Sequence, residues 1–90
     1  MQQNVTSLQT PLIGSNSYSD NSKKLGYIVA VISEFAKLHD ISVREAANYL
    51  VNYKGIDFLS DNYEAEHLLS IEDSVDDATQ VCLNNGGNIK

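Results

Sequence analysis

One histidine in the second half of the chain is the side chain best suited to acid–base chemistry. His67 is flanked by Glu64 and Glu66, and Asp76 and Asp77 follow shortly after it. A general base needs an orienting partner and a substrate within hydrogen-bond reach. The alternative is a structural role, in which the imidazole hydrogen-bonds backbone or a carboxylate at a buried corner. The structural role is favoured, so no catalytic residue is predicted.

Other reactive groups in the sequence lack the setting that chemistry requires. Ser70 is better placed as a helix cap than as a nucleophile. Cys82 is the single cysteine, so neither a disulfide framework nor a zinc pair is indicated, and we expect a small buried hydrophobe there. The carboxylates at 57–77 lack the spacing of a calcium loop, and the paired glycines at 86–87 follow a helical pattern instead of opening one. We therefore expect no enzyme, no metal site and no cofactor.

These groups must be positioned by helices, and the clearest helical pattern lies at residues 25–38. Apolar side chains recur there at spacings of three and four, as one face of an α-helix requires. The predicted stripe consists of Leu25, Ile28, Val29, Ile32, Phe35 and Ala36. A helix this apolar must be covered from more than one side, so the later elements are expected to pack around it.

Start and stop signals divide the rest of the chain. The first helix is expected to begin near Asp20 or Ser22. A capping box at 42–45 opens a second helix, which we expect Gly55 to end in the left-handed conformation. A second capping signature begins at Ser70, and Gly86 stops the last helix. The sequence predicts helices near 22–39, 43–54, 57–66 and 71–85, which make an all-α bundle of four helices with a short third one.

The length of 90 residues allows one small domain. Residues 22–90 are predicted to form it. Residues 1–21 are polar and aperiodic, so we expect a flexible tail that is dispensable for folding. The alternative is a docking segment anchored by Leu8, Leu12 and Ile13. The chain shows neither a membrane-length apolar run nor the pattern of a signal peptide, so a cytoplasmic setting is expected.

Charge is distributed unevenly along the chain. Eight of the twelve acidic residues lie at 57–77, whereas five of the six basic residues lie at 23–54. Residues 43–66 have the layout of a helix-turn-helix, but the chain has no lysine or arginine from Gly55 to Ile89. A DNA reader needs such cations to neutralise phosphates, so contact with nucleic acid by that surface is excluded. The acidic half is either a solvated surface or a docking patch for a basic protein.

The stretch Tyr63-Glu64-Ala65-Glu66-His67-Leu68-Leu69-Ser70, followed by Val75-Asp76-Asp77, resembles a family of small bacterial domains of unknown function. The apolar first helix, the capping box at 42–45 and the stop at 53–55 fit the same pattern. The resemblance covers roughly residues 24–86, and it departs from the family at Lys54 and Leu68. The family is similar to proteins encoded beside ADP-ribosyltransferase-like proteins, which implies a partner or antitoxin-like role.

We therefore expect a non-enzymatic protein–protein interaction module that binds a basic face of another protein. The predicted binding residues are Asp61, Tyr63, Glu64, Glu66 and Leu68. The predicted structural anchors are His67, Ser70, Asp76 and Asp77. Two alternatives stay open, a small enzyme centred on His67 and a subunit that only oligomerises.

Overall fold

The computed structural model describes residues 12–88, and over residues 12–20 it describes the backbone alone. This part of the chain contains five helices and no strand. The helices are α1 (Leu12–His39), α2 (Val43–Asn52), α3 (Gly55–Asp61), α4 (Tyr63–Glu66) and α5 (Ile71–Asn84). The predicted all-α fold is confirmed.

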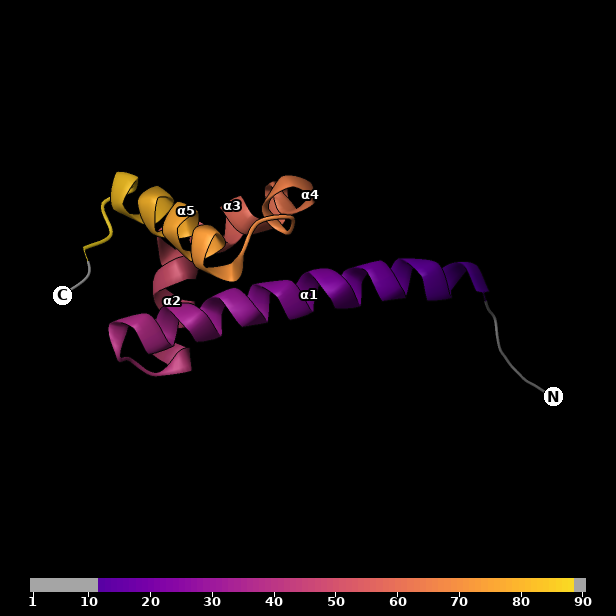
Figure 1. Ribbon diagram of the computed structural model, residues 1–90, viewed down its shortest axis with the longest axis horizontal. Helices are drawn as coiled ribbons and strands as arrows, with labels where there is room; N and C mark the ends of the chain where they lie inside the picture. The colour runs from indigo at the N-terminus through magenta and orange to yellow at the C-terminus, as the bar shows by residue number, and fades with distance from the viewer. Residues whose placement is uncertain (1–11, 89–90) are drawn as a thin grey trace.

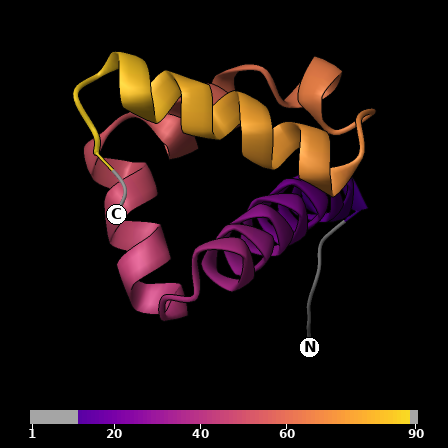
Figure 2. The same ribbon diagram turned by 60° about the vertical axis from the view of Figure 1, so that its left-hand side comes forward.

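The long helix α1 organises the other four. Figure 1 shows α3, α4 and α5 above α1, with α2 crossing behind it, and α1 extending past them toward the N-terminal end. Helices α2 and α5 both contact α1, and α3 lies against α5 and α2. Figure 2 shows α2 and α5 approaching α1 from two adjacent directions, with the rest of its surface left open.

The buried face of α1 differs from the predicted stripe. Val31 and Phe35, one turn apart, are fully buried, whereas Leu25 is 63% exposed and Val29 is also exposed. The expectation that Leu25 and Val29 face the core is therefore wrong. Helices α2 and α5 cover only part of the circumference of α1, so part of its apolar surface stays in solvent.

Helix α1 begins well before its predicted start near Asp20 or Ser22. Its helical backbone is continuous from Leu12. Extending an existing helix adds one hydrogen bond for each residue fixed and needs no new nucleation, so a serine or aspartate need not open a new helix. Residues 1–11 of the predicted tail lie outside the described residues, and the dispensability of the tail for folding stays a prediction.

The two predicted capping signatures, at Ser42 and at Ser70, are confirmed. The Ser42 hydroxyl accepts the Glu45 backbone N–H at 3.0 Å, and the Glu45 carboxylate accepts the Ser42 N–H at 3.0 Å. Ser70 accepts the Asp73 backbone N–H at 3.1 Å at the start of α5. These contacts satisfy amide donors that a helix start leaves without partners.

The predicted stop after α5 is also confirmed. Gly86 has a φ of +88°, the left-handed conformation that glycine adopts without steric cost. The Gly86 N–H donates to the Leu83 carbonyl at 3.1 Å, and the Gly87 N–H donates to the Cys82 carbonyl at 2.9 Å. This pair of bonds is the Schellman motif, which satisfies carbonyls at the helix end.

The turn between α2 and α3 corrects the prediction for Gly55. The left-handed residue is Lys54, with a φ of +74°, and Gly55 is the first residue of α3. A Cβ at Gly55 would lie 2.8 Å from the Cys82 Sγ and 2.9 Å from the Leu50 Cδ2. Gly55 is therefore used for close packing between helices and not for its backbone freedom.

The predicted helix at 57–66 is divided in two by Asn62. The backbone N–H and the side-chain amide of Asn62 both donate to the Phe58 carbonyl, each at 3.0 Å. Asparagine commonly offers the backbone such local bonds, which compete with continuation of a helix. The chain changes direction at this residue and resumes as the single turn α4.

The core is built by four of the five helices. Its buried apolar members are Val31, Phe35, Ala36, Ala46, Leu50, Leu59, Val75, Ala78 and Cys82. None of them comes from α4. Cys82 is fully buried, as predicted, and its burial raises the pKa of the thiol above the usual value. Helix α4 is instead attached through polar and aromatic contacts, which define the candidate site.

Candidate functional site

The turn between α4 and α5 carries two consecutive exposed leucines. Leu68 is 77% exposed and Leu69 is 42% exposed. The turn is tied by backbone bonds, because the Leu68 N–H donates to the Ala65 carbonyl at 3.3 Å and the Leu69 N–H donates to the Glu66 carbonyl at 3.0 Å. The capping contact of Ser70 holds its other end. The leucines are thus presented to solvent on an ordered backbone.

Carboxylates flank these leucines along the chain. Asp61 and Glu64 are exposed before the turn, and Tyr63 is half-buried. We call the surface formed by Asp61, Tyr63, Glu64, Leu68 and Leu69 the α4 corner. The α4 corner includes four of the five predicted binding residues.

The fifth predicted binding residue, Glu66, does not belong to this surface. Its side chain is only 7% exposed. The expectation that Glu66 contributes to an exposed acidic patch is wrong. Helix α4 is one turn long and must turn one side chain inward toward α5, and Glu66 is that residue.

A chain of hydrogen bonds connects α1, α5 and α4 beside Glu66. The Tyr27 hydroxyl donates to the Ser74 Oγ at 2.6 Å, and the Ser74 hydroxyl donates to the Glu66 backbone carbonyl at 3.1 Å. Ser74 is fully buried. Its spacing from Ile71 and Ala78 places it on the apolar face of α5, which is the signal that could have predicted its burial.

Burial raises the pKa of the Glu66 carboxyl above its usual value. A hydrogen bond with Asp77 and the negative charge of that residue raise it further. Burial also raises the pKa of Tyr27, and the charges of Glu66 and Asp77 add to this effect. The Glu66 carboxyl therefore holds its proton to higher pH than an exposed glutamate does.

We expect Glu66→Gln to be more stable than the wild type above neutral pH. A group whose pKa is raised by folding stabilises the fold below the pKa of the unfolded chain and loses this contribution as pH rises through the folded value. Glutamine stays neutral, and its amide can donate to Asp77. Urea unfolding at about pH 5 and about pH 8 measures the free energy of unfolding of both proteins. The difference in favour of the variant should be larger at the higher pH.

Glu64→Gln is the matched control, because Glu64 lies on the same helix and is exposed. It makes the same change of charge and should alter stability by less than about 0.5 kcal/mol at both pH values. Equal pH profiles for the two variants would show that the Glu66 carboxyl is ionised at no cost to the fold.

His67 is exposed, so the predicted buried corner at this residue is wrong. Its Nδ1 lies 2.7 Å from the Tyr63 carbonyl, and its ring stacks on the Tyr63 ring with centroids 4.5 Å apart. A carbonyl only accepts, so Nδ1 carries the proton. Of the two predicted partners, backbone or a carboxylate, the structure shows the backbone carbonyl of Tyr63.

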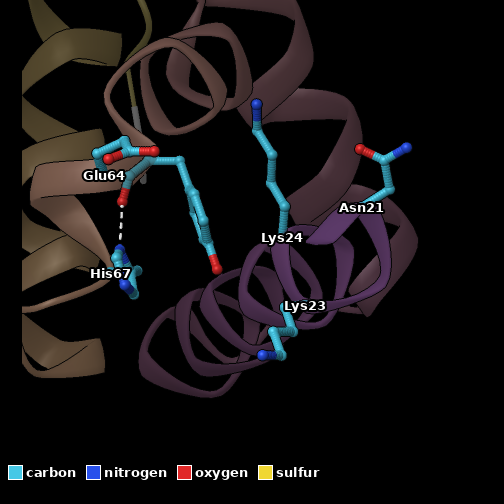
Figure 3. A pocket seen from close by; sticks show the side chains of 6 residues that line it. Asn21, Lys23, Lys24, Glu64 and His67 are labelled. Atoms are coloured by element: carbon cyan, nitrogen blue, oxygen red, sulfur yellow. Dashed lines mark hydrogen bonds between the residues drawn. The ribbon is translucent and has the colours of Figure 1, made fainter. Parts of the chain in front are cut away.

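A pocket of about 410 Å³ lies between α1 and α4. Figure 3 shows the side chains that line it, which are Asn21, Lys23, Lys24, Tyr63, Glu64 and His67. The Lys24 ammonium lies 5.9 Å from the centroid of the Tyr63 ring. The sequence did not predict this pocket, since its two walls are about forty residues apart along the chain.

Neither a candidate metal centre nor a candidate membrane span occurs among the described residues. Among residues 12–88, no group of three histidine, cysteine, aspartate or glutamate side chains could hold a metal ion. No helix in that range is long and apolar enough to cross a membrane.

The fold and the site together define a small all-α domain with an exposed, acidic helical corner. A family model described as a protein of unknown function (DUF3791) matches residues 26–85, and the chain belongs to this family. The match runs from the middle of α1 to the end of α5. No curated protein and no solved structure matched the chain.

Proposed function

We propose that this protein is a non-enzymatic interaction module that binds a partner protein through the α4 corner. The observation that carries the proposal is the exposure of Leu68 and Leu69 on an ordered turn. A single exposed leucine is ordinary on a protein surface, but consecutive exposed leucines on a rigid turn supply the apolar anchors of an interface.

The charges around the leucines favour a basic partner. Asp61 and Glu64 are exposed beside the turn, and no lysine or arginine occurs from Gly55 to Ile89. Acidic rim residues of this kind steer a basic partner during encounter, while desolvated apolar anchors supply most of the affinity.

The partner that we propose is an ADP-ribosyltransferase-like protein encoded beside this one. Its identity rests on the family resemblance alone, and the role would then be antitoxin-like.

The double variant Asp61→Asn/Glu64→Gln tests the proposed steering. We expect its association rate with the neighbouring gene product to fall by about 2- to 10-fold at low salt and to approach the wild-type rate at about 0.5 M salt, where charges are screened. Stopped-flow or surface-based kinetics would measure both rates.

The control is Asn48→Lys/Asn52→Lys, which changes the net charge by the same amount on exposed positions of α2. It should slow association much less, because steering depends on local charge at the binding surface. Equal rates for wild type and Asp61→Asn/Glu64→Gln at low salt would show that the acidic side chains are only solvated surface.

A further inference from the structure

The pocket between α1 and α4 differs in charge from the rest of the acidic protein. The chain has a formal net charge of −6, yet this pocket is lined by two lysines and only one carboxylate, Glu64. Lys23 and Lys24 come from α1, and Glu64 comes from α4. A concave site of net positive charge in an acidic protein attracts anions selectively to that place.

The aromatic wall of the pocket is held on two sides. Tyr63 stacks on His67 at an interplanar angle of 18°, and its ring meets the edge of Tyr27 with centroids 5.5 Å apart. The Tyr63 ring therefore contacts the His67 ring and lies 5.9 Å from the Lys24 ammonium. The cation–π contact of Lys24 with this ring orients the ammonium at the pocket wall before any ligand arrives.

The imidazole of His67 has one nitrogen left for a ligand. Its Nδ1 is used by the Tyr63 carbonyl, so Nε2 is the remaining polar atom of the ring. The stacking on Tyr63 keeps the ring at the pocket.

The opposite charges of the pocket do not neutralise each other. Among the side chains described from Asn21 to Asn88, the ion pair within 4.0 Å is that of Lys37 with Glu34, away from the pocket lining. Glu64 lines the same cavity as Lys23 and Lys24 but makes no such contact with them. No direct ion pair with Glu64 therefore occupies the ammonium groups of Lys23 and Lys24.

From this geometry we propose that the pocket binds an anionic oxygen group, a phosphate or a carboxylate. Lys24 is the main electrostatic contact, and Lys23 adds charge at the rim. Glu64, Tyr63 and Asn21 are the other groups that face the ligand. Binding of a small anion does not depend on the α4 corner binding a partner protein, because the probes are free ions.

Nuclear magnetic resonance titration of the full chain with sodium phosphate and with sodium acetate tests this site. The titration is run at constant ionic strength and about pH 6, where histidines are partly protonated. We expect saturable shifts of the backbone amides of Lys24, Tyr63 and His67. Saturation by phosphate alone would assign a phosphate site, and saturation by both ions a site for either oxyanion.

Lys24→Ala and Lys37→Ala form the matched pair of variants, since both remove one ammonium from α1. Lys24→Ala should weaken binding by about 3- to 10-fold, as expected for loss of a partly exposed charged contact, whereas Lys37→Ala should leave it unchanged. Shifts that increase linearly with both ions, or equal weakening by the two variants, would overturn the proposal.

Discussion

Phe35→Ala is expected to lower the free energy of unfolding by about 3–5 kcal/mol. Phe35 is a fully buried large side chain of α1 that stacks on Tyr49 of α2, with ring centroids 5.4 Å apart and an interplanar angle of 20°. The His39 ring also lies close to the Phe35 ring, with the two ring centroids 4.4 Å apart. Removing the ring leaves a cavity between the two helices, and a domain of this size has little stability in reserve.

Leu25→Ala provides the control for Phe35→Ala. Leu25 lies on the same helix and is 63% exposed, so its truncation should change stability by less than about 1 kcal/mol. Urea unfolding followed by circular dichroism measures both. A larger loss for Leu25→Ala than for Phe35→Ala would mean that α1 packs through its other face.

Gly55→Ala is expected to destabilise the protein by about 1–3 kcal/mol, although alanine normally favours a helix over glycine. The added methyl group would lie within 3 Å of Cys82 and Leu50, which are both fully buried. It would also lie 3.3 Å from the Leu50 backbone carbonyl. Because both side chains are fully buried, either they must repack or the start of α3 must shift away from α5.

Gly26→Ala is the matched control, because it makes the same substitution within a helix where a Cβ meets nothing within 4 Å. It should raise stability by about 0.5–1 kcal/mol. Thermal unfolding measures whether each variant gains or loses stability relative to the wild type. Stabilisation by Gly55→Ala would contradict the close approach of α3 to α5.

Local signals in the sequence were sufficient to predict three of the helix ends. The capping box of Ser42 and Glu45, the cap at Ser70 and the stop at Gly86 all form as predicted. Each depends on residues only a few positions apart, so its geometry is determined by the local backbone. The all-α class follows from these signals and from the absence of strand-like alternation.

Features that depend on packing across the chain could not be predicted in the same way. Gly55 resembles a helix cap, and its contact with Cys82 appears only when α3 meets α5. Glu66 resembles its exposed neighbour Glu64, and only the docking of α4 against Ser74 shows that it is buried. Such positions are determined by tertiary contacts that override local pattern.

The site was predicted in part for the same reason. Asp61, Glu64 and Leu68 are exposed around α4, which is consistent with a binding surface. The pocket joins Lys24 to Tyr63 across two elements distant in sequence, and no local pattern connects them.

The affinity of Leu68→Ala for the proposed partner, an ADP-ribosyltransferase-like protein, tests the proposed function most directly. Leu83→Ala is the control, since it removes the same side chain from an exposed position of α5. If the α4 corner is the interface, Leu68→Ala should raise Kd by about 10-fold or more without changing the melting temperature, and Leu83→Ala should leave Kd unchanged. An unchanged Kd for Leu68→Ala, or no binding by the wild-type protein, would contradict the proposal.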